Sequence, residues 1–144
     1  MSYWVVILIG LIGGVTIGIQ SPIAGAMGQK VGGIASSFIL QLSGMIWSGL
    51  FLAIRGGENI QNWSNLPWYM LASGGLALIF YLTVNITMPC LGSAMMLALI
   101  VTGQLLVGIL IDHFGLLGVE VRHLDLSRLI GGLLLLVGCY FISK

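Results

Sequence analysis

Residues 68–111 read WYMLASGGLALIFYLTVNITMPCLGSAMMLALIVTGQLLVGILI and contain no Asp, Glu, Lys or Arg. A helix needs about 20 apolar residues to cross the roughly 30 Å hydrocarbon core of a bilayer. This stretch is therefore long enough for two crossings. Pro89 and Gly92 lie near its middle, and both residue types are typical of helix ends. We predict two transmembrane helices, 68–88 and 91–111, joined by a very tight turn.

Apolar segments of similar length occur elsewhere in the chain. They predict further helices at residues 3–28, 33–54 and 126–142, of which the last is the shortest. No segment alternates in the roughly ten-residue pattern of a membrane β-strand. Backbone groups in lipid must also be hydrogen-bonded within the protein. We therefore predict an all-α, polytopic membrane helix bundle of about five transmembrane helices, with residues 1–144 forming a single domain.

Composition supports a membrane protein. Hydrophobic residues make up 58% of the chain and charged residues 6%, and the mean hydropathy is +1.12. A soluble domain carries about 25% charged residues, so lipid must be the main solvent here. The net charge of +1 gives no indication of a nucleic-acid partner. The first apolar run lacks the positive segment of a signal peptide, and we interpret it as the first membrane helix.

The residues that could carry chemistry do not form a catalytic constellation. We expect His113 and His123 in a polar loop, and the sequence shows no embedded carboxylate pair, metal cluster or phosphate-binding loop. Cys90 and Cys139 lie in apolar surroundings without metal-ligand spacing, so we expect unpaired thiols. The sequence therefore predicts neither an enzyme nor a bound cofactor or metal.

A few polar and aromatic side chains lie inside the predicted spans. Such groups are costly in lipid and usually face protein or a water-filled cavity. By helical rise, Gln20, Gln41 and Tyr81 lie about 12–13 Å from one side, close to the midplane. We predict that these three and Gln104 face a common interior space. The candidates for a substrate path are Gln20, Ser21, Gln41, Trp47, Tyr81, Asn85 and Gln104. The alternative is that the amides only link helices to one another.

Two features of the first helix suggest further roles. Proline removes a backbone donor, so the motif QSP at residues 20–22 predicts an interruption of the helix. Broken helices near the midplane bind ligands in many transporters, although a kink without function is the alternative. Gly10, Gly14 and Gly18 are spaced for close helix packing, either within one bundle or between two copies.

The distribution of positive residues gives a weak orientation signal. Five helices place the termini on opposite sides of the membrane. Arg55, Arg122 and Arg128 then fall on the N-terminal side, and Lys30 and Lys144 fall on the other. Positive residues near helix ends favour the cytoplasm, so the N-terminal side is the better cytoplasmic candidate. The small difference would permit insertion in both orientations.

Several motifs resemble one family, the YdcZ-like branch of the drug/metabolite transporter superfamily. The motifs are QSP at 20–22, PW at 67–68, PCLGS at 89–93, VTGQ at 101–104, IDHFG at 111–115 and RLIGG at 128–132. The likeness spans the whole chain and is strongest from Trp68 onward. Residues 24–29 depart from it, because an Asn and an Arg-rich helix end are expected there and only Lys30 is present.

The resemblance implies a five-helix unit equivalent to one half of a ten-helix transporter, in which two inverted halves surround the substrate path. A single copy would need an oppositely inserted partner, either itself or a paralogue. The resemblance also implies a small transporter of the bacterial inner membrane that moves a small organic solute. This transporter would act as a dimer, and the two protomers could be antiparallel. The expected partners are the solute, membrane lipid and the second protomer. A non-transporting membrane subunit of a larger complex is the alternative.

Asp112 adjoins the end of the predicted helix 91–111. It directly follows the apolar run at residues 105–111, which would place it at the membrane interface. We expect a structural role for it, with Arg122, Arg128 or His113 as its partner.

Overall fold

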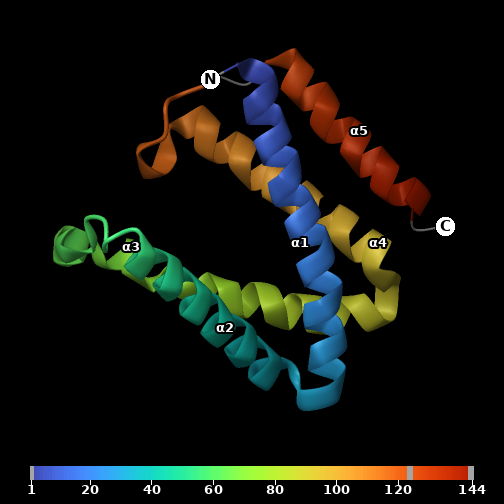
Figure 1. Ribbon diagram of the computed structural model, residues 1–144. Coiled ribbons are helices and arrows are strands. Elements are labelled where there is room, and N and C mark those ends of the chain that lie inside the picture. Colours follow the sequence, from blue (N-terminus) through green and yellow to red (C-terminus); the bar gives the residue numbers. More distant parts are fainter. Residues whose placement is uncertain (1, 123–124, 143–144) are drawn as a thin grey trace. The chain divides into compact units, whose positions relative to one another are not determined.

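The computed structural model describes residues 2–122 and 125–142, except for the side chains of residues 128 and 129. Every regular element within these residues is a helix, which confirms the all-α prediction. In chain order (Figure 1) the elements are α1 (Tyr3–Val31), α2 (Gly33–Ile54), the 3-10 turn η1 (Ile60–Asn65), α3 (Trp68–Ala72), α4 (Gly74–Phe114), the 3-10 turn η2 (Leu116–Gly118) and α5 (Leu126–Ile142).

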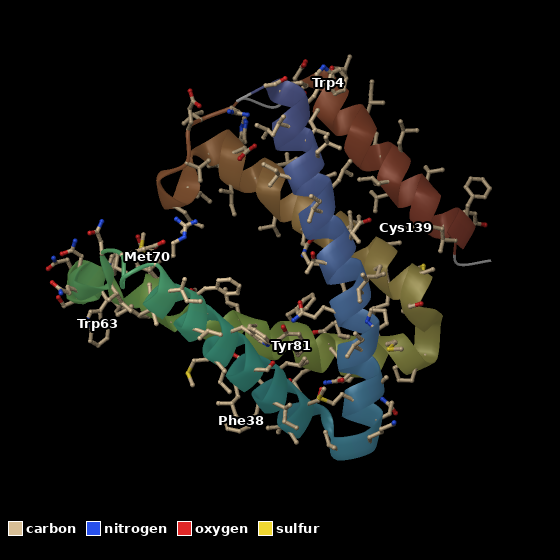
Figure 2. All side chains as sticks on the ribbon, in the orientation of Figure 1. Trp4, Phe38, Trp63, Met70, Tyr81 and Cys139 are labelled. Carbon is tan, nitrogen blue, oxygen red and sulfur yellow. The ribbon has the colours of Figure 1, made fainter. Side chains whose placement is uncertain are left out.

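The helices present apolar side chains outward along their whole length. Trp4, Phe38 and Trp63 are 71%, 65% and 62% exposed (Figure 2). Exposed apolar area on this scale is not found on soluble monomers and needs an apolar solvent. In the described chain, α1, α2 and the run from Trp68 to Phe114 are long and apolar enough to cross a membrane. The final apolar helix is shorter, as the sequence predicted.

The chain divides into two compact units, Met1–Pro89 and Cys90–Lys144. The first unit contains α1, α2, α3 and the first part of α4. The second unit contains the remainder of α4 and α5. The five-helix single domain remains a prediction.

Helix α1 is longer than predicted and is not interrupted. It continues through Pro22 to Val31, whereas the predicted helix ended at residue 28. Lys30 and Val31 are still helical, and the helix ends where Gly32 adopts a φ of 89° and donates its N–H to the Gly28 carbonyl at 2.9 Å. A positive φ is easily adopted only by glycine, so Gly32 determines the helix end. The predicted break at residues 20–22 is wrong as a break in the helix.

The predicted tight turn between the third and fourth spans is confirmed. Helix α4 is continuous on both sides of Gly92, where φ is 75° and ψ is 166°. This conformation is essentially restricted to glycine. Pro89 lies inside the last helical turn before it. One residue therefore separates the two apolar spans.

Helix α4 also ends later than predicted. It reaches Phe114 instead of residue 111, so Asp112 and His113 lie in its last turn and not in a loop. The expectation of a loop position for His113 is therefore wrong. His123 and Lys144 fall outside the described residues.

The first unit packs through the C-terminal half of α1. Its buried residues are Ser21, Ala24, Gly25 and Gly28, which recur at the spacing of one helix face. The neighbouring helix α2 buries Ser36, whose hydroxyl donates to the Ala24 carbonyl at 3.1 Å. Small residues allow helix backbones to approach closely, which is how helices associate in lipid.

The N-terminal half of α1 is different. A Cβ added to Gly10, Gly14 or Gly18 would meet nothing within 4 Å. A Cβ added to Gly25 or Gly28 would collide with side chains of α4. Within this unit the glycines near the C-terminal end of α1 therefore allow close helix packing, whereas Gly10, Gly14 and Gly18 contact no other helix of the unit.

Candidate functional site

Gln20 and Tyr81 form a direct contact between α1 and α4. The Gln20 amide nitrogen donates to the Tyr81 hydroxyl at 3.0 Å. Gln20 precedes the helix end at Val31 by 11 residues, and Tyr81 precedes the turn at Gly92 by 11 residues. Both therefore lie about 16 Å from the same side by helical rise, near the middle of a roughly 30 Å core. The sequence had placed them together but shallower, because the predicted helices ended at residues 28 and 88, before the ends at Val31 and Gly92.

The pair retains capacity for further hydrogen bonds. A glutamine amide offers two N–H groups and a carbonyl oxygen, and the contact with Tyr81 uses one N–H. Gln20 is exposed and Tyr81 is partly exposed. At this depth the remaining polar atoms need a partner of some kind.

Pro22 removes the helical hydrogen-bond donor of a backbone carbonyl at this level of the membrane. Because proline has no N–H, the helical hydrogen bond to the carbonyl four residues earlier, at Gly18, cannot form. Beside it, the Ser21 side chain is 1% exposed and its hydroxyl has no partner within the described chain. The motif at residues 20–22 therefore concentrates unused hydrogen-bonding groups without breaking the helix.

Gln41 and Trp47 both lie on α2 and are exposed. Gln41 is eight residues from the start of α2 at Gly33, about 12 Å by helical rise. One turn before Gln41, the Ser37 hydroxyl is buried and donates to the Gly33 carbonyl of its own helix. Gln41 and Trp47 are thus open surface residues of the first unit.

Asn85 has the geometry of a residue that links helices. It is 7% exposed, and its amide nitrogen donates to the Gly33 carbonyl at 3.3 Å. Its own backbone carbonyl accepts a hydrogen bond from the Gln29 side chain at 3.1 Å. Among the described residues its amide oxygen has no hydrogen-bond donor, and it lies where a Cβ at Gly28 would be. Asn85 therefore links α1, α2 and α4 by hydrogen bonds. This is the alternative to a substrate path that the sequence left open for these amides.

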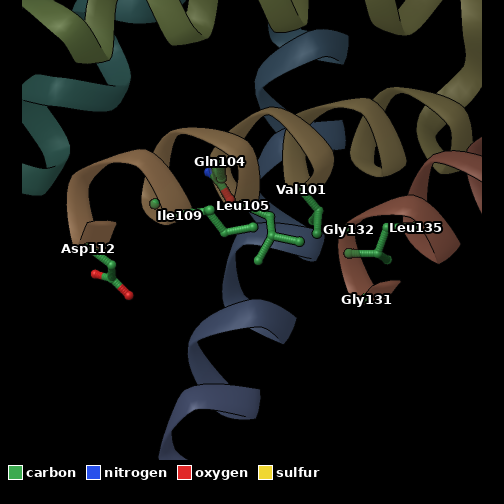
Figure 3. Close-up of a pocket in the computed structure, with 9 residues that line it drawn as sticks. Val101, Gln104, Leu105, Ile109, Asp112, Gly131, Gly132 and Leu135 are labelled. Atoms are coloured by element: carbon green, nitrogen blue, oxygen red, sulfur yellow. The ribbon is translucent and has the colours of Figure 1, made fainter. Parts of the chain in front are cut away.

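Gln104 lies in the second unit, in a pocket of about 580 Å³ between α4 and α5 (Figure 3). Along α4 the lining residues recur at one-turn spacing, and α5 closes the other side with two adjacent glycines. The lining residues are Val101, Gln104, Leu105, Gly108, Ile109, Asp112, Gly131, Gly132 and Leu135. Asp112 was not among the candidate site residues, since its place in this pocket depends on α5, which is distant in the sequence.

The surroundings of Asp112 were predicted only in part. Its backbone carbonyl accepts the Arg122 N–H at 2.8 Å, which ties the following loop to the end of α4. The Arg122 guanidinium lies 3.7 Å from a carboxylate oxygen of Glu120. The side chain of Arg128, another expected partner, lies outside the description. The structural role expected for Asp112 therefore remains a prediction.

Comparison with known proteins identifies the family. Residues 5–141 match the family model described as "Putative inner membrane exporter, YdcZ". No curated protein and no solved structure matches the chain. The match covers nearly the whole chain, and it names a family of exporters rather than one of enzymes. This chain therefore belongs to the YdcZ family of inner membrane exporters and is an integral membrane transporter.

Proposed function

We propose that this transporter exports a small organic solute as a dimer, with Gln20 and Tyr81 contributing to a substrate site near the membrane midplane. The observation that carries this proposal is the Gln20–Tyr81 hydrogen bond, made by two side chains that are not buried. Within lipid, polar groups that remain accessible usually face a cavity or a pathway.

Hydrogen-bond capacity favours a pathway over a purely structural link. A structural link would be expected to be buried, as Asn85 and the Ser36 hydroxyl are. Gln20 is instead exposed, and within the described part of the chain its amide oxygen and one N–H are unused. The Gly18 carbonyl, which receives no hydrogen bond from Pro22, lies two residues earlier on the same helix. These groups could hold a solute that carries both donors and acceptors.

The proposed dimer is antiparallel. The predicted count of five spans is odd, so one chain cannot supply an inverted repeat of itself. The positive residues number three on one side and two on the other, which is too small a difference to fix one orientation. A site about 16 Å deep in a core of about 30 Å would lie at nearly the same level in an inverted copy. Two such copies could therefore share one central site.

Transport can be tested with purified full-length protein in liposomes loaded with a mixture of small organic solutes. Mass spectrometry would measure the loss of each solute, with protein-free liposomes as the reference. We expect at least one solute to leave faster with the protein present. Gln20→Leu should slow that loss about tenfold, the effect of removing one or two hydrogen bonds to the solute.

The matched control is Thr16→Val. Thr16 lies one turn before Gln20, and its hydroxyl donates to the Ile12 carbonyl of its own helix. This variant should leave solute loss unchanged. Absence of accelerated loss for every solute would contradict the proposal and favour a non-transporting subunit.

Orientation can be tested with single cysteines at Asn62 and Val31, in a background with Cys90 and Cys139 replaced by alanine. Asn62 lies in η1 and Val31 at the end of α1, so the two positions report on opposite sides. An impermeant thiol reagent on intact cells should label each position in part. If one position labels fully and the other not at all, an antiparallel homodimer is excluded and an inverted paralogue would be required.

A further inference from the structure

The pocket between α4 and α5 has the features of a ligand site. Its volume of about 580 Å³ lies within the range of about 300–1,000 Å³ that is usual for small-molecule pockets. We infer that it binds an organic ammonium compound, with the ammonium group at Asp112 and the apolar body along Leu105, Ile109 and Leu135. The inference goes beyond the proposed function, because binding here does not require that the ligand be exported.

Glycines create the space. A Cβ added to Gly108 or Gly131 would meet nothing within 4 Å, and one added to Gly132 would meet only the Ile109 side chain at 4.0 Å. Side chains at these three positions would occupy the pocket, so its volume depends on their absence. The remaining walls are mostly aliphatic, as in pockets that bind drug-sized ligands.

Two polar side chains would orient a ligand. Asp112 and Gln104 are eight residues apart on the same face of α4, or about 12 Å by helical rise. Figure 3 shows Asp112 at one end of the pocket and Leu135 toward the other. A ligand with one charged end and an apolar body therefore matches the arrangement, and Gln104 could bind a second polar group on a longer ligand.

The charge of the preferred ligand follows from the position of Asp112. This carboxylate lies in the last turn of α4, close to the helix end at Phe114. The C-terminal end of a helix carries partial negative charge, which favours cations and opposes a carboxylate. An ammonium group bound there would meet the negative end of the helix and an acceptor oxygen of Asp112. An anionic ligand would be repelled by the helix end.

Asp112 already interacts with another group of the chain. A carboxylate has about four acceptor positions on its two oxygens, so an existing partner leaves positions for an ammonium group. The side chain is also partly exposed. Access and acceptor capacity are therefore both sufficient.

The test uses full-length protein in nanodiscs of digalactosyl diacylglycerol, a neutral bilayer lipid whose headgroup carries no ammonium group. The probe is phenethylammonium, with the neutral 2-phenylethanol and the anionic 3-phenylpropanoate as matched compounds. Ligand-detected saturation-transfer NMR would measure binding, and empty nanodiscs would correct for partition into lipid. We expect saturable binding of the ammonium compound, and binding at least about tenfold weaker for the other two.

Variants locate the site. Asp112→Asn should weaken phenethylammonium binding about tenfold, and Asp112→Glu should retain it. Gly131→Leu, which fills the pocket and keeps the carboxylate, should also abolish binding. The matched control is Glu120→Gln, which removes an exposed carboxylate that does not line the pocket. It should bind like the wild type.

Absence of saturable binding to the wild-type protein, or equal binding by Asp112→Asn, would overturn the inference. If Asp112→Asn does not fold, retained binding by Gly131→Leu would overturn it equally. Replacing part of the lipid by phosphatidylethanolamine tests whether a lipid amine competes for the same site. Solute export that is unaffected by Asp112→Asn, together with absent binding, would leave the proposed function standing while this inference fails.

Discussion

Gly28→Ala should destabilise the first unit markedly. The added Cβ would overlap the side-chain amide of Asn85, including its oxygen and carbon. The amide would have to move, and its 3.3 Å bond to the Gly33 carbonyl would be lost. Forcing an extra methyl into a packed interface costs about 1–3 kcal/mol, and a lost interhelical hydrogen bond in lipid adds about 0.6 kcal/mol. We expect a total loss of about 1.6–3.6 kcal/mol from these two effects.

The control is Gly13→Ala in the same helix. A Cβ at Gly13 would meet nothing within 4 Å. Both variants gain the same preference of alanine over glycine for helix, up to about 1 kcal/mol, so their difference isolates the contact with Asn85. Reversible unfolding in mixed dodecyl maltoside and SDS micelles would measure both free energies. Equal stability of the two variants would refute the close packing of α1 on α4.

A double-mutant cycle sharpens the test. In the Asn85→Ala background the space beside Gly28 is vacated, so Gly28→Ala should then cost little. We expect the two changes to be non-additive by about 2 kcal/mol, since contacting residues typically couple by 0.5–3 kcal/mol. Additive effects would mean that the two residues do not touch.

Two further predictions concern the turn in α4 and the cysteines. Gly92→Ala should lower the free energy of unfolding by about 1–3 kcal/mol, because a φ of 75° is strained for any residue with a Cβ. The control Gly103→Ala, at a helical position with open space, should not lower it. Thermal unfolding in detergent would measure both variants. Cys90 is exposed and should react with a maleimide in detergent. Cys139 is 7% exposed and lies 3.1 Å from the Thr102 hydroxyl, so it should react only after unfolding. Mass spectrometry would follow the labelling, and similar reaction rates of the two thiols would contradict this prediction.

The helix limits were predicted well where a glycine or a charged residue lies at the end of the apolar segment. The limits of α2 follow from Gly33 at its start and Arg55 after its end, and both agree with the structure. The end of α1 was missed because Lys30 suggested a boundary, while the backbone ends the helix only at Gly32. The break expected at Pro22 was wrong because one missing hydrogen bond does not stop a helix of 29 residues.

Contacts between distant residues were less accessible to sequence reasoning. Equal depth suggested that Gln20 and Tyr81 belong together, and their hydrogen bond agrees with that. Depth alone could not show that Asn85 is pressed against Gly28, because this depends on how α1 and α4 cross. The place of Asp112 in a pocket could not be inferred either, since α5 supplies the opposite wall.

The central claim is that Gln20 and Tyr81 line a water-accessible path and are not a dry link between helices. Gln20→Cys, in a background lacking Cys90 and Cys139, can be exposed in native membranes to a water-soluble methanethiosulfonate. Its neighbour Ile19, 61% exposed and apolar, provides the control Ile19→Cys. We predict that Gln20→Cys reacts at least about tenfold faster, because thiols react as thiolates, which form only in contact with water. Equally slow reaction at both positions would contradict the claim and indicate a structural link.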